Sequence, residues 1–299
     1  MKKVVILGGT TYDSIVHLKN LPEQKPQTIH YASFNETLGS TGAGKALNLA
    51  KLNVPTVLHS IIGNDIYGEK IVKSLTSNGV NFIYDIDANG TERHINIMDE
   101  EGNRISIFVT NSSDSPSLDL DRLESIIRDC DIIVLNIISY TKKLINLCKK
   151  YNKPIWTDLH DYDGKNSYHE DYINVSDYIF MSSDNMSDYK SVMKDLYSKG
   201  KKLIVCTHGK KGATCLAESG DWIQTDIIDK YRYKDANGAG DSFFSGFLYG
   251  YLQNKSIEEC LRFATICAGL CITSEELAYK DLSEEILNKE YFDCYIKNR

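Results

Sequence analysis

The chain has 299 residues, a mass of 33.8 kDa and a formal net charge of −7 at neutral pH. This length is enough to bury a large core, as one big α/β domain or two smaller ones. The acidic balance argues against nucleic acid or an anionic membrane surface as the main partner, and the sequence has no apolar run of about 18 residues that would predict a membrane span.

The N-terminal segment predicts a buried strand followed by polar residues. A β-branched run at residues 4–7 ends at a Gly-Gly pair, which is typical of a central strand rather than a signal peptide. Asp13 lies at the carboxyl end of this strand, where open α/β sheets collect ligands. On its own, an aspartate here is a turn or helix cap. Residues 14–18 and 28–38 mix polar and apolar side chains, so we expect exposed strands of a separate small sheet.

A glycine-rich segment, LGSTGAGKALNLAKL, occupies residues 38–52. It predicts a glycine loop that opens a helix and lets a small ligand touch the backbone. The segment is one residue away from the Walker A pattern, because Ala46 stands where a Mg²⁺-binding hydroxyl is needed. The preceding residues are a poor buried strand, so a P-loop NTPase is the weaker alternative. Outside that alternative, the sequence assigns no role to Lys45.

The next two segments predict a strand, a helix and a hairpin. The apolar run at 56–62 is followed by GNDIYG and a helical pattern that ends at Gly79, which indicates an N-capped helix with a glycine C-cap. Residues 91–109 alternate around a turn at 101–103 and predict a β-hairpin. Arg93 and His94 lie on this hairpin, either as exposed residues or as groups that reach a ligand.

From residue 121 onward, helical and strand patterns alternate, which predicts a mostly parallel sheet with helices on both faces. Helices are expected at 121–130, 141–151 and 187–199, and strands at 131–136, 154–158, 178–182 and 202–207. The polar loop at 157–164 is expected near the rim of a site. The eight cysteines form no C-x-x-C pair, and we expect buried thiols in a reducing cytoplasm.

The most informative stretch is DANGAGDSFFSGFLYGYL at residues 235–252. Its spacing predicts a glycine turn that feeds a buried helix, with Gly246 and Gly250 on a face that another backbone can approach. Unpaired amides at such a helix start bind phosphate oxygens. A carboxylate beside them, Asp241, suits phosphoryl transfer, in which it takes the proton of an attacking hydroxyl. The plainer interpretation is an acidic helix cap.

This stretch resembles the C-terminal signature of the ribokinase-like carbohydrate kinases of the phosphofructokinase-B type, D-T/S-x-G-A-G-D-x-F, with Ala236 as the departure. The 39–44 segment is similar to the family's sugar-holding G-G-x-x-x-N element, although Ser40 replaces a glycine and Gly44 the asparagine. The G-x-D-x-x-G segment after residue 62 and the T-x-G-x-x-G turn at 207–212 also match.

One family motif is degraded. The N-x-x-E element near Mg²⁺ and the phosphates has Ser183 and Met186 at its matching positions, with Asp184 and Asp188 as nearby carboxylates. The resemblance covers nearly the whole chain. It implies one domain over residues 1–299, a three-layer α/β fold with a mostly parallel sheet, and a small β-sheet lid drawn from about 14–38 and 91–109. It also implies a homodimer through that lid.

The implied activity is ATP-dependent transfer of the γ-phosphoryl group to a hydroxyl of a small sugar. Asp241 is implied as the general base and the backbone of Gly238, Ala239 and Gly240 as the anion hole. Mg²⁺ travels with ATP, and Asp235 is a candidate ligand for K⁺. The further implied contacts are substrate contacts at Asp13, Gly39, Ser40, Gly42 and Gly44, and nucleotide contacts at Thr207, Gly209, Gly212, Asn237 and Gly240. A nucleoside kinase of the same fold and a non-catalytic ligand-binding relative stay open as alternatives.

Overall fold

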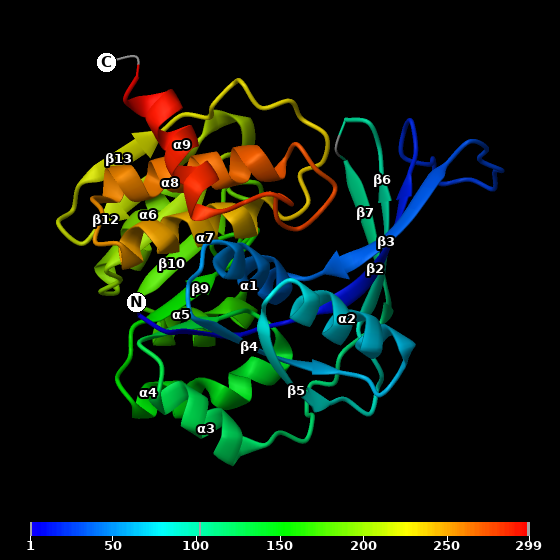
Figure 1. The fold of residues 1–299 in the computed structure, drawn as a ribbon, viewed down its shortest axis with the longest axis horizontal. Helices are drawn as coiled ribbons and strands as arrows, with labels where there is room; N and C mark the ends of the chain where they lie inside the picture. The colour runs from blue at the N-terminus through cyan, green and yellow to red at the C-terminus, as the bar shows by residue number, and fades with distance from the viewer. Residues whose placement is uncertain (1, 102, 298–299) are drawn as a thin grey trace.

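The computed structural model describes residues 2–101 and 103–297 of the chain, and within them two sheets stand apart (Figure 1). The large sheet has the strand order β13-β12-β11-β10-β9-β8-β1-β4-β5. Its strands are β1 (Val4–Leu7), β4 (Thr56–Ile62), β5 (Asn81–Ile86), β8 (Ile132–Leu135), β9 (Ile155–Asp158), β10 (Tyr178–Ser182), β11 (Leu203–Thr207), β12 (Ala213–Ala217) and β13 (Trp222–Thr225).

Neighbouring strands pair in parallel from β5 to β11, whereas the β11–β12 and β12–β13 pairs are antiparallel. The chain leaves β1 toward β4 and β5 on one side and later returns to β8 on the other. The strand order therefore reverses at β1. In open α/β sheets, the carboxyl ends of strands at such a reversal form the ligand-binding crevice.

Helices cover both faces of the large sheet (Figure 1). Val4 and Ile6 of β1 face one apolar core, and Val5 and Leu7 face the other. This is the alternation expected of a strand buried on both sides. The helices are α1 (Thr41–Lys51), α2 (Ile66–Ser77), α3 (Leu120–Arg128), α4 (Ile145–Lys150), α5 (Glu170–Val175), α6 (Tyr189–Ser198), α7 (Ala239–Leu252), α8 (Ile257–Cys271) and α9 (Glu284–Tyr295).

Helix α7 is held in place by aromatic packing and by close approach to α8. Trp156 of β9 is fully buried, and its ring lies 6.0 Å from that of Phe244 on α7. A Cβ at Gly246 would lie 2.7 Å from the Phe263 carbonyl of α8, so only glycine permits this helix pair, as the sequence predicted. The packing fixes the position of the first turn of α7.

The small sheet has the order β3-β2-β6-β7 and consists of β2 (Thr11–His17), β3 (Ser33–Gly39), β6 (Arg93–Met98) and β7 (Arg104–Thr110). In Figure 1 it extends away from the large sheet. The predicted strands at 14–18 and 28–38 are shifted: β2 begins at Thr11, and residues 28–32 are not in a strand. The predicted hairpin turn includes Gly102, which lies outside the described residues.

The remaining predicted elements lie close to the observed ones. The strands at 4–7, 56–62 and 178–182 have the predicted bounds, whereas the helix predicted at 141–151 is a 3₁₀ turn, Ser139–Leu144, followed by α4. None of the helices in the described ranges has the length and apolar character needed to cross a bilayer.

Candidate active site

The turn before α7 places backbone N–H groups at the helix start. Gly238 is the N-cap residue, with φ 78°, and a Cβ there would lie 2.6 Å from the Leu277 carbonyl. Among the interactions of the described residues, the N–H groups of Gly240 and Asp241 have no protein acceptor. The Ala239 N–H, however, donates to the Ala236 carbonyl at 3.1 Å. Of the three amides predicted to form the anion hole, that of Ala239 is therefore not available to a ligand, because it is already hydrogen-bonded within the protein.

Asp241 lies in the first turn of α7 and is more buried than the sequence indicated. Its exposure is 8%, and its Oδ1 accepts a hydrogen bond from Lys45 Nζ at 2.5 Å. The same Nζ donates to Asp158 Oδ2 at 3.0 Å, and Lys45 itself is 0% exposed. We call Lys45, Asp158 and Asp241 the ion triad. A carboxylate at this depth is tolerated because a buried ammonium ion compensates its charge.

The ion triad shifts the pKa values of all three groups. Burial raises the pKa of the Asp241 carboxyl, and the Lys45 ammonium offsets part of that rise. Burial alone would raise the pKa of Asp158 as well, but Lys45 and His160 hold it down at about 2. For Lys45, burial would lower the pKa, yet the two carboxylates outweigh it and raise the pKa above its ordinary value. The charged form of the lysine is therefore favoured.

Gly44 of α1 lies directly against the ion triad. A Cβ at Gly44 would lie 2.5 Å from Asp241 Oδ2, so the absence of a side chain makes room for this carboxylate. Lys45 Nζ lies 4.9 Å from the centre of the Phe244 ring, whose face supports the ammonium ion. Gly44 was predicted as a substrate contact. In the structure it contacts Asp241.

Asp13 lies on β2, and one of its carboxylate oxygens accepts no hydrogen bond. Its exposure is 5%; Oδ2 accepts a hydrogen bond from Asn96 Nδ2 at 3.4 Å, and buried Oδ1 has no hydrogen-bond partner. His94 Nδ1 lies 3.6 Å from Oδ1. Burial raises the pKa of Asp13, and His94 is the largest opposing influence. Gly39 leaves the room for this group, since a Cβ there would lie 2.2 Å from Asp13 Oδ2.

The two hairpin residues left open by the sequence face inward. His94 contacts Asp13, and its ring centre is 3.9 Å from that of Phe108. The Arg93 guanidinium lies 3.7 Å from the centre of the Tyr67 ring on α2. Both side chains are half-buried rather than exposed. Strand β6 is thus tied to Asp13 and to α2.

The start of α1 lies against the carboxyl ends of β1 and β8. A Cβ at Gly42 would lie 2.5 Å from the Gly9 carbonyl, and the Asn136 side-chain amide donates to Thr41 Oγ1. Ser40 has φ 72° and ψ 152°, a backbone region that is nearly restricted to glycine. Strain of this kind concentrates at functional sites. This group therefore lies at the strand-order reversal, where ligands are expected.

The turn predicted to bind nucleotide follows β11. Gly209 and Gly212 both have positive φ, 54° and 80°, and the His208 N–H donates to the Gly212 carbonyl at 2.8 Å. His208 Nδ1 also contacts Ser183 Oγ at 3.0 Å, which ties the degraded motif to this turn. Asp188 caps α6 through the Ser191 N–H at 3.1 Å, so its carboxylate is engaged in the fold.

Asp235 precedes α7 in the chain and is buried at 2% exposure, and its N–H donates to the Ile272 carbonyl at 3.2 Å. Its Oδ1 accepts the Asn237 N–H at 2.8 Å, and its Oδ2 has no hydrogen-bond partner. A buried carboxylate oxygen without a partner is costly unless a cation or water satisfies it. The residue therefore fits the cation role that the sequence resemblance implied.

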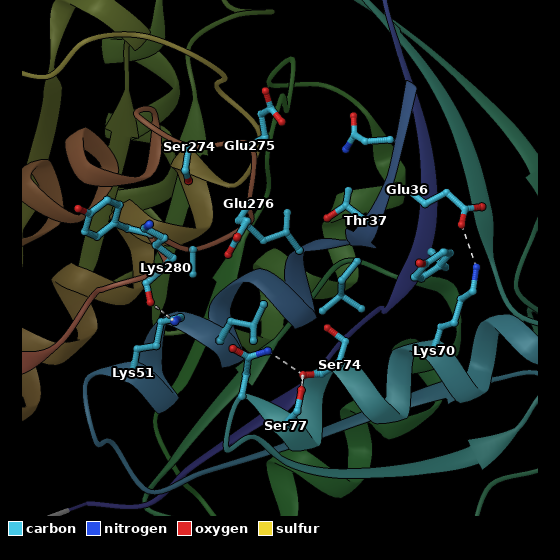
Figure 2. A pocket seen from close by; sticks show the side chains of 18 of the residues that line it. Glu36, Thr37, Lys51, Lys70, Ser74, Ser77, Ser274, Glu275, Glu276 and Lys280 are labelled. Carbon is cyan, nitrogen blue, oxygen red and sulfur yellow. Dashed lines mark hydrogen bonds and ion pairs between the residues drawn. The ribbon is translucent and has the colours of Figure 1, made fainter. Parts of the chain in front are cut away.

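Figure 2 shows a further cavity, which has a volume of about 850 Å³. It is enclosed by α1, α2, β3 and the loop at 273–280. Lys70 of α2 binds Glu36 of β3 at 2.8 Å, and Lys51 of α1 donates to the Lys280 carbonyl at 2.7 Å. Neither Asp13 nor Asp241 is among the described residues that line it. The cavity contacts β3 and is distinct from the ion triad.

The fold and the glycine-rich start of α7 define a class of phosphotransferases with an alcohol acceptor, and sequence comparison agrees. The chain matches the pfkB family carbohydrate kinase family over residues 1–284 and belongs to it. It is 27% identical to acarbose 7(IV)-phosphotransferase of Actinoplanes sp., over 90% of this chain and 92% of that protein. It is 26% identical to a nucleoside kinase of Methanothermobacter thermautotrophicus, over 92% and 90%.

Solved structures share the whole fold. The microbiome-derived acarbose kinase Mak1 has a TM-score of 0.86 at 25% identity, covering 96% of this chain and 98% of that one. The ribokinase of Arabidopsis thaliana, solved with ribose and ATP, has a TM-score of 0.81 at 23% identity, covering 97% and 98%. The predicted ribokinase-like fold and family are therefore confirmed, and the chain is a carbohydrate or nucleoside kinase.

The P-loop alternative is wrong. Strand β3, which precedes the Walker-like segment, pairs antiparallel with β2 in the small sheet rather than lying inside the parallel sheet. Lys45 is fully buried between two carboxylates and is not free to reach a phosphate group. The sequence left Lys45 unassigned and gave Asp158 no individual role, beyond its place at the end of a predicted strand and in the polar loop at 157–164 that was expected near the rim of a site.

Proposed function

We propose that the chain transfers the γ-phosphoryl group of ATP to a hydroxyl of a small sugar-like substrate, with Asp241 as the general base. The observation that carries this proposal is the position of Asp241 in the first turn of α7, next to unpaired backbone N–H groups at the positive end of a helix dipole. A carboxylate at that point accepts the hydroxyl proton, while the amides stabilise charge on the phosphoryl group.

In this proposal Asp13 binds the acceptor. Its free Oδ1 and neighbouring His94 offer a charged acceptor and a ring nitrogen to a polyol. Gly39, Ser40 and Gly42 supply backbone contacts beside it. The turn at Gly209 and Gly212, with Thr207, Asn237 and Gly240, binds the nucleotide. Mg²⁺ enters with the ATP phosphates, which supply most of its ligands.

Asp235 is proposed to bind a monovalent cation such as K⁺, on the strength of its buried unpartnered Oδ2. Such a cation would neutralise charge beside the helix start. The test is the rate as a function of K⁺ at constant ionic strength. We expect K⁺ to activate the wild type and not Asp235→Ala, and equal activation of both would contradict the assignment.

The general-base role is tested with Asp241→Asn. We expect kcat to fall by roughly 10²-fold or more, the usual size of a lost general base, while binding of a non-hydrolysable ATP analogue is largely retained. Turnover near the wild-type rate would refute the role of Asp241. The acceptor is found by thermal-shift screening of acarbose, ribose, deoxyribose and nucleosides with the same analogue.

A nucleoside acceptor is the second candidate, favoured by the aromatic pair beside Asp13. The rings of His94 and Phe108 lie 3.9 Å apart and offer a surface on which a base can stack. Phosphorylation of nucleosides but not of free sugars in the same panel would select this alternative. Ligand binding without turnover across the panel would indicate a non-catalytic relative.

The exposed face of the small sheet supports a proposed homodimer. Its apolar residues include Phe34 on β3 and Ile107 and Val109 on β7, with exposures of 63%, 45% and 45%. Apolar groups that gather on one exposed sheet face are typical of an interaction surface. The small sheet would then act both as a lid over the acceptor and as the dimer contact.

A further inference from the structure

The buried ammonium of Lys45 has no part in the roles proposed so far. Lysine is among the residues least often fully buried, and an ammonium ion removed from water is costly unless it is paired. Here it is paired twice, with Asp241 at 2.5 Å and Asp158 at 3.0 Å. One of those partners is the proposed base. A charge that contacts the reacting carboxylate this closely affects both its orientation and its protonation.

The geometry fixes the orientation of Asp241. Its Oδ1 is held by Lys45 Nζ, whereas its Oδ2 lies over the bare Cα of Gly44. Lys45 is in turn anchored by Asp158, whose Oδ1 accepts the His160 N–H at 3.0 Å. The ammonium is thus clamped between a fixed carboxylate and the base, with the Phe244 ring below it.

We propose that Lys45 is a positioning residue that holds Asp241 as an oriented carboxylate, and that Asp158 holds Lys45 in place. This inference rests on the proposed function, because it takes Asp241 as the group that accepts the hydroxyl proton. Lys45 itself touches neither the acceptor nor the phosphates in this account.

The charges around Asp241 predict the direction of each effect. Lys45 faces it from α1, Asp158 and His160 face it from the end of β9, and Cys271 approaches it from α8. Burial raises the pKa of Asp241; Lys45 and His160 lower it, and Asp158 raises it. Removal of the ammonium therefore moves the pKa of Asp241 further up, and removal of Asp158 moves it down.

The direct test measures protonation of Asp241 without any acceptor. Carboxyl ¹³C resonances of aspartate-labelled protein are titrated, and the Asp241 signal is assigned by its loss in Asp241→Asn. In Lys45→Met we expect the apparent pKa of Asp241 to rise by about 1–3 units, the range for a lost neighbouring opposite charge. In Asp158→Asn we expect it to fall. Lys45→Arg keeps the charge and should stay within about one unit of the wild type.

A second lysine provides the matched control. Lys201 is also buried, at 8% exposure, but its Nζ donates to the Ser176 carbonyl at 2.9 Å. Lys201→Met should leave the Asp241 titration unchanged. Lys45→Met leaves two buried carboxylates facing each other, so the double variant Lys45→Met/Asp158→Asn, which removes one charge of each sign, is measured with it.

The kinetic readout separates positioning from simple stability. The acidic limb of the pH profile of kcat/KM, measured with the acceptor found by the screen, should shift to higher pH in Lys45→Met and in the double variant. The KM for ATP should stay near the wild-type value. A titration and an acidic limb that do not move in either folded variant, or an Asp158→Asn titration that does not fall, overturn the role of Lys45. Normal turnover of Asp241→Asn overturns the proposed base instead, and the two failures are thereby distinguished.

Discussion

Acidification should destabilise the fold through one buried histidine, His59. This residue lies on β4, and its side chain is fully buried. Its Nδ1 is 3.2 Å from the Tyr140 hydroxyl and its Nε2 is 3.2 Å from Asp85. Burial lowers the pKa of His59 from 6.5 to about 4, and the hydrogen bond with Asp85 only partly opposes this.

The sign and size of the effect follow from linkage. Between pH 6.5 and about 4 the unfolded chain protonates His59, whereas the folded protein keeps it neutral. The stabilisation is therefore complete above pH 6.5 and is lost as the pH falls toward 4. Each unit of pKa difference corresponds to about 1.4 kcal/mol, so protonation of His59 should lower the unfolding free energy by roughly 3 kcal/mol as the pH falls from 6.5 to about 4.

The measurement is urea unfolding followed by circular dichroism across this pH range. In His59→Gln, where the side chain does not titrate, we expect the stability curve to be flatter than that of the wild type by up to about 1.4 kcal/mol per pH unit. His30 is exposed, so His30→Gln should follow the wild-type curve. Parallel curves for the wild type and His59→Gln would refute the reasoning.

Three further predictions concern the proposed site and the small sheet. Ser40→Gly should raise the unfolding free energy by about 1–3 kcal/mol through release of backbone strain, yet lower kcat/KM if the hydroxyl contacts substrate; a lower melting temperature would contradict the strain. Gly44→Ala should cut kcat by roughly 10²-fold, because its Cβ would displace the Asp241 carboxylate; in Gly240→Ala, where a Cβ has nothing within 4 Å, the fold should keep its melting temperature. Ile107→Lys at this exposed position should convert the proposed dimer to a monomer in light scattering, and an unchanged mass would argue against dimerisation through the small sheet.

Much of the large sheet was predictable because its strands are short apolar runs. The strands at 4–7 and 178–182 are buried over most of their length, so their composition identifies them. Strand β5 was missed: it lies at the sheet edge, and its half-buried residues mix polar and apolar types. Helix α9 was missed as well, since Leu287 is its one buried residue and the apolar pattern is weak.

The sequence predicted only those parts of the site whose residues lie close together in the chain. The glycine turn before α7 and the acidic residue after it lie within one short stretch, so the sequence placed Asp241 at a helix start. The partners of Lys45 are 113 and 196 positions away, and no periodicity relates such distant residues. The burial of Asp241 follows from that pairing, which explains why the sequence predicted a more open carboxylate.

The ion triad also has a consequence for biosynthesis. The ribosome makes Lys45 long before Asp241, so a nascent chain that stops short of α7 contains the lysine without one of its two counter-ions. A buried ammonium ion lacking its full complement of partners disfavours premature collapse around α1. Docking of α7 brings Asp241 to Lys45 and supplies the missing negative charge, so we expect a chain truncated before α7 to be less compact around α1 than the full-length chain.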